Sequence, residues 1–205
     1  SITDNLLETI IDQCPKNVEA ADELDGKNPL HNLCLNPAVN RDMLERVVDS
    51  YPEACGFTRG GYSPLQCLCL NPSYSIDMMG LLIDSAPLSV HVETHCDAAL
   101  FLLCANPSIT RHALERLIGA RPKSVFFEYN GETPLHRLVE NPSLTVHMLR
   151  FLVEAHPGAA SQMEQYTGRY PLHRLCGNPA LDPEWLDVVL RANPTAACKP
   201  IGTTF

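Results

Sequence analysis

The sequence predicts an all-α solenoid, in which helix-turn-helix repeats stack on one another and hairpin-like loops connect successive repeats. Three observations support this prediction: a repeated phrase, a fixed period and a regular series of helix starts. The phrase reads GETPLHRLVENP at 131–142 and returns as GRYPLHRLCGNP at 168–179, GKNPLHNLCLNP at 26–37 and, more loosely, GYSPLQCLCLNP at 61–72. A period of about 20–50 residues indicates units that bury their apolar faces only by stacking.

The spacing of two sets of prolines gives the length of the repeat. The Asn-Pro pairs begin at Asn36, Asn71, Asn106, Asn141 and Asn178, in steps of 35, 35, 35 and 37 residues. A second set follows the same period: Pro15, Pro52, Pro87, Pro122, Pro157 and Pro194. The third copy, CDAALFLLCANP at 96–107, lacks the Gly and the first Pro but keeps the register. We therefore expect one domain, 1–205, of about five and a half repeats: a half repeat 1–25 and repeats 26–60, 61–95, 96–130, 131–167 and 168–205.

The first helix of each repeat should begin at the Pro-Leu pair of the phrase. Pro fits the first helical turn, where its missing N–H is not needed, and Thr133 or Ser63 just before it can cap the helix. Leu135, Leu138 and Val139 then form one apolar face. We expect this helix to end at Asn-Pro, with Asn in the left-handed conformation and Pro stopping the helix.

The second helix has the most regular start signal in the chain. Each expected N-cap is preceded by an apolar residue and followed four positions later by another, the pattern of a hydrophobic staple. These N-caps are Thr3, Asn40, Ser75, Thr110, Thr145 and Asp182. The helix should run about ten residues to the second proline. The linkers end in tight-turn pairs such as Asn130-Gly131 and Asp25-Gly26, which favour hairpin-like loops between repeats.

At Thr133-Pro134-Leu135-His136 the chain resembles the ankyrin repeat, whose hallmark is Gly-x-Thr-Pro-Leu-His at the start of the first helix. The resemblance covers nearly the whole chain, although ankyrin repeats run about 33 residues and these run 35 to 37. It implies that the histidine hydrogen-bonds across the hairpin base, and that partners bind the concave face and loop tips. A generic two-helix solenoid is the alternative. Neither end has a polar capping repeat, so we expect an excerpt of a longer array or ends covered by partners.

Composition narrows the classes of partner. The net charge of −9 argues against nucleic acid, because binding to a phosphate backbone needs a basic surface. No apolar run reaches the roughly 18 residues of a membrane span, and no signal segment opens the chain, so we expect no membrane insertion. Catalytic motifs of the Gly-x-Ser-x-Gly, phosphate-loop and His-Glu-x-x-His types are missing, which favours a protein that is not an enzyme.

Four of the nine cysteines occupy one repeat position, which holds Val139 in the remaining copy: Cys34, Cys69, Cys104 and Cys176. A position that accepts Val is a small apolar core position. Neighbouring helices lie roughly 8–10 Å apart, too far for a disulfide between repeats. Free thiols favour an intracellular, reducing compartment, whether cytoplasmic, nuclear or organellar. The state of the linker cysteines stays open: Cys14, Cys55, Cys96 and Cys198.

The pairs His31-x-x-Cys34 and His173-x-x-Cys176 could begin a zinc site, since each places two ligands one helical turn apart. Such a site needs two further ligands, and His136 has Val139 as its neighbour instead. A structural histidine is the favoured interpretation. We expect no metal and no cofactor.

The positions that vary between repeats predict the function. Five first-helix residues differ after the histidine position: Asn32, Cys67, Leu102, Arg137 and Arg174. Tyr and Arg are enriched at interaction hot spots. We therefore expect a non-enzymatic scaffold that binds a protein partner through Phe101, Leu102, Tyr129, Arg137, Tyr166, Arg169 and Arg174. The partner should carry an apolar or aromatic anchor near Leu102 and carboxylates toward Arg174.

Other interpretations of the same residues stay open. The chain could be the recruitment segment of a larger enzyme, a structural subunit of a large assembly, or a zinc or redox module. The variable surface could be inert. The arginines could also pair internally with Glu132 and Glu164, and surface pairs of that kind would contribute little.

Overall fold

The computed structural model describes residues 28–56, 62–85 and 98–199. The predicted half repeat 1–25, the Asp25-Gly26 turn and the thiols of Cys14 and Cys96 lie outside these residues. The chain divides into two compact units, Ser1–Cys96 and Asp97–Phe205, next to the predicted boundary between the second and third repeats. A single domain over 1–205 stays a prediction, and each unit is described by itself.

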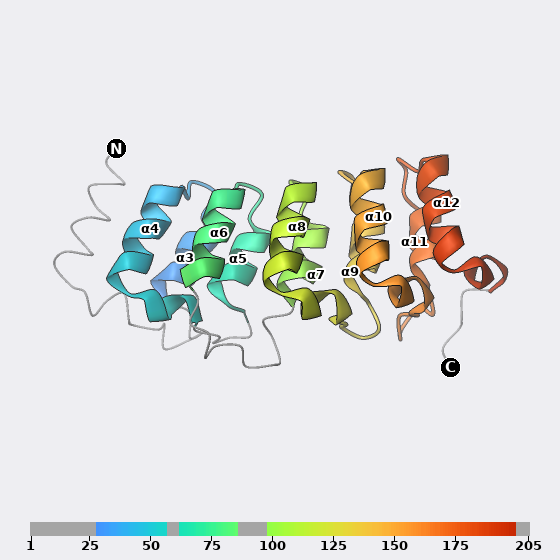
Figure 1. Ribbon diagram of the computed structural model, residues 1–205, viewed down its shortest axis with the longest axis horizontal. Coiled ribbons are helices and arrows are strands. Elements are labelled where there is room, and N and C mark those ends of the chain that lie inside the picture. Colours follow the sequence, from blue (N-terminus) through green and yellow to red (C-terminus); the bar gives the residue numbers. More distant parts are fainter. Residues whose placement is uncertain (1–27, 57–61, 86–97, 200–205) are drawn as a thin grey trace. The chain divides into compact units, whose positions relative to one another are not determined.

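The first unit contains two stacked helix pairs. Its elements are α3 (Pro29–Leu35), α4 (Arg41–Ser50), the 3₁₀ helix η1 (Pro52–Gly56), α5 (Pro64–Leu70) and α6 (Ile76–Ser85). The first helices α3 and α5 pack together, and so do the second helices α4 and α6 (Figure 1).

The second unit repeats this arrangement three times. Its elements are α7 (Ala98–Ala105), α8 (Arg111–Ala120), η3 (Pro122–Phe126), α9 (Pro134–Val139), α10 (Val146–Ala155), η4 (Pro157–Ser161), α11 (Pro171–Cys176), α12 (Pro183–Ala192) and η5 (Pro194–Cys198). The first helices α7, α9 and α11 form one row, and the second helices α8, α10 and α12 form another (Figure 1). The predicted all-α solenoid of stacked helix pairs is confirmed.

The second helices begin where the cap pattern predicts. The side chain of Asn40 accepts a hydrogen bond from the Met43 N–H at 2.9 Å, and Thr145 accepts one from Met148 at 3.3 Å. The staple leucines are fully buried in α4, α8 and α10, at Leu44, Leu114 and Leu149. In α12 the equivalent residue, Leu186, is only half-buried.

The backbone conformation at the Asn-Pro pairs differs from the prediction. Asn36 has φ −73° and ψ 123°, which is extended backbone and not the left-handed conformation. The reason lies in the next repeat, whose Asn71 side chain donates to the carbonyls of Cys34 and Asn36, both at 2.9 Å. Asn141 does the same to Cys104 at 2.8 Å and Asn106 at 2.9 Å. Asn71 and Asn141 therefore satisfy the last carbonyls of the preceding first helix in their own unit, and Asn71 also has extended backbone (φ −79°, ψ 120°).

The linkers contain an element that the sequence analysis missed. The second prolines at Pro52, Pro122, Pro157 and Pro194 end the second helices as predicted, and each also begins a short 3₁₀ helix.

The linker after η3 closes as the predicted hairpin. Tyr129 and Glu132 form an antiparallel bridge, and Asn130 (φ 53°) and Gly131 (φ 78°) supply the turn. The Gln165 N–H donates to the Asn130 carbonyl at 2.9 Å, which joins this hairpin tip to the following loop.

The shared cysteine position is buried core in three of its four copies. Cys34, Cys69 and Cys104 have no exposed surface, whereas Cys176 is exposed, which corrects the prediction for that residue. A following first helix packs against α3 and α7, which carry Cys34 and Cys104, whereas no first helix follows α11 among the described residues. Cys55 is buried, and burial raises the pKa of its thiol to about 11. All cysteines of the described segments are free thiols.

No helix in the described part of the chain is both long enough and apolar enough to cross a lipid bilayer.

Candidate partner-binding site

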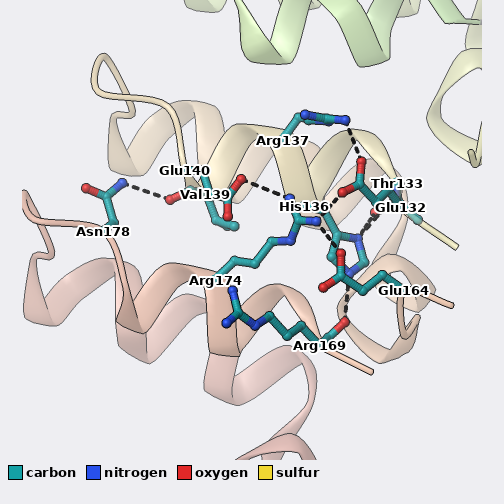
Figure 2. A network of polar contacts seen from close by, with 10 residues as sticks. All are labelled: Glu132, Thr133, His136, Arg137, Val139, Glu140, Glu164, Arg169, Arg174 and Asn178. Atoms are coloured by element: carbon teal, nitrogen blue, oxygen red, sulfur yellow. Dashed lines mark hydrogen bonds and ion pairs between the residues drawn. The ribbon is translucent and has the colours of Figure 1, made fainter. Parts of the chain in front are cut away.

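The repeated histidine joins each first helix to the loop of the next repeat. The Nδ1 atom of His136 accepts the Thr133 N–H at 3.1 Å, so its Nε2 carries the proton and donates to the Arg169 carbonyl at 3.4 Å (Figure 2). His31 makes the same pair of bonds to Asn28 and to the Tyr62 carbonyl. The predicted structural role is confirmed.

His173 follows the same pattern, with Nδ1 accepting from the Tyr170 N–H and Nε2 directed at the Lys199 carbonyl at 3.0 Å. Both ring nitrogens of each histidine are therefore engaged by the backbone. In the residues that the structure describes, no three His, Cys, Asp or Glu side chains come together to hold a metal ion.

Burial lowers the pKa of His136 to about 4, and the neighbouring Arg174 guanidinium adds to this effect. His136 is therefore neutral near pH 7 and can serve as acceptor and donor at once.

Arg174 of α11 is the centre of an ion-pair cluster. Its side chain is 9% exposed and pairs through Nη2 with Glu132 and Glu164, and through Nη1 with Glu140 at 2.9 Å (Figure 2). Burial alone would lower the pKa of Arg174, but the bonds to these carboxylates raise it above its ordinary value. Because Glu132 and Glu140 flank α9, the cluster joins two adjacent repeats.

Arg137 occupies the same position in α9 and has different neighbours. It pairs with Glu132 at 2.6 Å, and its guanidinium lies 4.7 Å from the centre of the Phe101 ring. Phe101 is only 7% exposed, with its ring edge-to-face against Phe127 at 5.5 Å. The expectation that Phe101 forms an exposed apolar centre is therefore wrong, because Arg137 and Phe127 cover it.

The seven predicted site residues fall into three groups. Tyr129, Tyr166 and Arg169 are exposed, Leu102 and Arg137 are half-buried, and the side chains of Phe101 and Arg174 are buried. Internal pairing with Glu132 and Glu164, the alternative considered for the arginines, is confirmed for Arg174, and Arg137 pairs with Glu132. Because the Arg174 side chain is buried, its ion pairs are not surface pairs that contribute little to stability.

Two exposed apolar residues in the loops of the predicted tyrosines were not predicted from the sequence. Phe126 is 62% exposed and Met163 is 45% exposed. Phe126 lies three positions before Tyr129, and Met163 lies three positions before Tyr166. The two residues therefore occupy equivalent repeat positions, 37 residues apart, and this spacing is the sequence signal that could have identified them. Glu140 was also missed, because its partner Arg174 lies 34 residues away.

Solved structures with the same arrangement of helix pairs identify the fold. The human ASB11 ankyrin repeat domain has a TM-score of 0.65 and 17% sequence identity, over 91% of this chain and 77% of that chain. The chain has an ankyrin-repeat fold. A chain from the structure of the Bdellovibrio bacteriovorus predatory endopeptidase Bd0816 in complex with the immunity protein Bd3460 has a TM-score of 0.66 and 18% identity, over 90% and 92% of the two chains.

No protein-family model and no curated protein matches the sequence. At these identities the likeness shows the fold, and the predicted ankyrin resemblance is confirmed at that level.

Proposed function

We propose that this ankyrin-repeat chain is a non-enzymatic protein-interaction scaffold, which binds a partner protein through the first helices and hairpin tips of its second unit. One observation carries the proposal: Tyr129 and Tyr166, 61% and 73% exposed, occupy the same position in adjacent loops. Tyrosine supplies a large contact area at a low entropic cost, which is why it is enriched at hot spots.

The loops that carry these tyrosines are fixed by the backbone. Gly131 has φ 78°, and a Cβ added there would lie 2.5 Å from the Met163 carbonyl oxygen, so the two loops are in close contact. The Gln165 N–H also bonds to the Asn130 carbonyl. A rigid surface loses less conformational entropy on binding than a mobile one, which supports binding at these tips.

The exposed side chains define the partner's anchor. Phe126 and Met163 are exposed three positions before the two tyrosines in the chain, and Leu102 on α7 is half-buried. An aromatic or aliphatic side chain of the partner would bury these side chains. The acidic residues expected of the partner depended on three arginines, but Arg137 and Arg174 already pair internally, so Arg169 is the remaining candidate among them.

The comparisons support the general class of this function. One of the similar folds comes from a structure of two proteins in complex, the endopeptidase and its immunity protein. Free thiols in the described segments support our further proposal that the chain works in a reducing intracellular compartment.

The test begins with capture of the partner from native extract and identification by mass spectrometry. The affinity of that partner is then measured for a Tyr129→Ala, Tyr166→Ala double variant and for Leu102→Ala. Loss of two hot-spot residues should weaken binding by about 100-fold, since each costs about 1–2 kcal/mol.

Glu115→Ala is the control, because Glu115 lies on α8 and, among the described residues, pairs with exposed Arg111 at 2.7 Å. Circular dichroism verifies that all variants are folded. If Glu115→Ala weakens binding as much as the tyrosine variant does, the partner does not use this surface.

A further inference from the structure

A pocket of about 200 Å³ lies between the end of α9 and the two ends of α11 in the second unit. We propose that this pocket binds the side-chain carboxamide of a glutamine or asparagine. That the carboxamide belongs to a partner protein rests on the proposed function, whereas the chemical preference of the pocket does not.

Most polar groups that line the pocket are already engaged. The two ring nitrogens of His173 bond to the backbone, as described above. The Asn178 amide donates to the Val139 carbonyl at 2.8 Å and accepts from the Ala180 N–H at 2.9 Å. The Gly177 N–H bonds to the Arg174 carbonyl at 3.0 Å. A ligand would have to break these bonds to use the same hydrogen atoms.

Four lining groups keep hydrogen-bonding capacity. The Arg174 Nε–H is buried without a partner in the described part of the chain, and the Asn178 amide has a second N–H beyond the one that it donates to Val139. The other two groups are exposed. Arg169 is exposed, and its guanidinium makes no hydrogen bond or ion pair with another described residue. Glu140 is 44% exposed and uses Oε2 toward Arg174 Nη1, while Oε1 has no hydrogen bond within the described residues (Figure 2). The pocket therefore offers a donor from Arg169 and an acceptor from Glu140.

The exposed charges that line the pocket have opposite signs. The charged lining residues are Arg169, Arg174 and Glu140. Arg174 is already paired with Glu132 and Glu164, which lie outside the lining, so Arg169 and Glu140 are the charges that a ligand meets. A carboxylate ligand would bond to Arg169 but be repelled by Glu140, and a cationic ligand would meet the reverse conflict. A carboxamide offers its carbonyl to Arg169 and its N–H to Glu140 without adding net charge.

The size of the pocket favours a side chain over a larger ligand. Pockets for small molecules usually have about 300–1,000 Å³, which exceeds this one. The end of one side chain fits the smaller space. This requirement replaces the carboxylates that the sequence led us to expect toward Arg174.

The test uses three blocked amino acids that differ only in the head group: the N-acetyl amides of glutamine, glutamic acid and lysine. Each is titrated into the ¹⁵N-labelled chain, and the Arg169 Nε–Hε and Gly177 amide signals are followed by NMR. The three compounds have the same backbone amides, so any difference in their affinities is due to the side chain. The glutamine compound should bind about tenfold more tightly than the other two, as expected for one charge-assisted hydrogen bond.

Two variants separate the roles of the charged groups. Arg169→Gln should weaken binding of the glutamine compound about tenfold, since the guanidinium donor is lost. Glu140→Gln leaves an excess positive charge and should reverse the preference toward the glutamic acid compound. Arg191→Gln is the matched control on α12, because Arg191 is 80% exposed and away from the pocket lining, and it should change nothing.

Three outcomes overturn the pocket assignment, and a fourth bears on the proposed function alone. Equal binding of all three compounds would mean that the pocket does not select by head group. Tighter binding of the glutamic acid compound by the unchanged chain would restore the carboxylate expectation. Unchanged signals with all three would show that the pocket holds only water. Selective glutamine binding without capture of any partner would refute the proposed function and leave the pocket assignment intact.

Discussion

Helices α9 and α11 share the five residues Pro-Leu-His-Arg-Leu but bury different members of that sequence. In α9 the histidine, His136, has no exposed surface and the arginine is 37% exposed, whereas in α11 the histidine is half-buried and the arginine is 9% exposed. Arg137 faces Phe101 of the preceding repeat, while Arg174 faces Glu132 and Glu140. The role of a residue in this array therefore depends on the neighbouring repeat as much as on its own sequence.

The arginine position should show the largest difference between the two helices. Arg174→Ala leaves Glu132 and Glu164 part-buried without their shared cation, which should lower the free energy of unfolding by about 3–5 kcal/mol. Arg137→Ala loses a half-exposed ion pair and a cation–π contact, and should cost about 1 kcal/mol. Urea unfolding of both variants measures the two costs. Equal losses would show that burial of Arg174 carries no energetic weight.

The second comparison concerns the staple leucines in the second helices of the same two repeats. Leu149→Ala in α10 removes a fully buried side chain and should cost about 2–5 kcal/mol. Leu186→Ala in α12 removes a half-buried one and should cost about half as much. Thermal unfolding by calorimetry gives both values. A Leu149→Ala midpoint no lower than that of an exposed control such as Glu115→Ala would show that the staple contributes no stability.

The buried histidine of α9 should make stability depend on pH. The pKa of His136 falls from 6.5 to about 4 on folding, so the unfolded chain binds more protons between these values. The stability from neutral His136 is complete above about pH 6.5 and is lost as pH falls toward 4, by about 3 kcal/mol in all.

His136→Gln isolates this effect, because Gln66 already fills the same position in α5 and accepts the Ser63 N–H. The unfolding free energy of this variant, measured by urea titration from pH 7 to 4, should fall less than that of the unchanged chain. Parallel pH profiles would contradict the assignment of the dependence to His136.

The helix caps should show the smallest effects and no dependence on the neighbouring repeat. Thr145 and Asp182 cap α10 and α12 through bonds to their own helices, to the Met148 and Glu184 N–H groups. Replacing either by Ala should cost about 1 kcal/mol. If urea unfolding gave a loss for Thr145→Ala several times that for Asp182→Ala, the caps too would depend on their surroundings.

The local features were predictable from the sequence. The caps at Asn40 and Thr145, the helix pairs and the Asn130-Gly131 hairpin all depend on residues a few positions apart. The wrong predictions depended on residues about one repeat apart. Asn71 reaches Cys34 across 37 positions, and Arg174 reaches Glu132 across 42.

The candidate site shows the same division. Tyr129 and Tyr166 were expected at loop tips, and they are exposed there. Phe101 was expected to be exposed because its own helix gave no sign of Arg137 and Phe127 covering it. The pocket beside Arg169 could not be predicted either, since Glu140 reaches it from the preceding repeat.

The central claim is our proposal that buried residues, Arg174 among them, hold the second unit together, while its exposed loop tips bind a partner. Hydrogen–deuterium exchange of the chain, with and without the captured partner, tests it most directly. The account predicts that the partner slows exchange in α7 and in the loops at 127–132 and 163–170, and leaves α8, α10 and α12 unchanged. Slowed exchange confined to the second helices would contradict it.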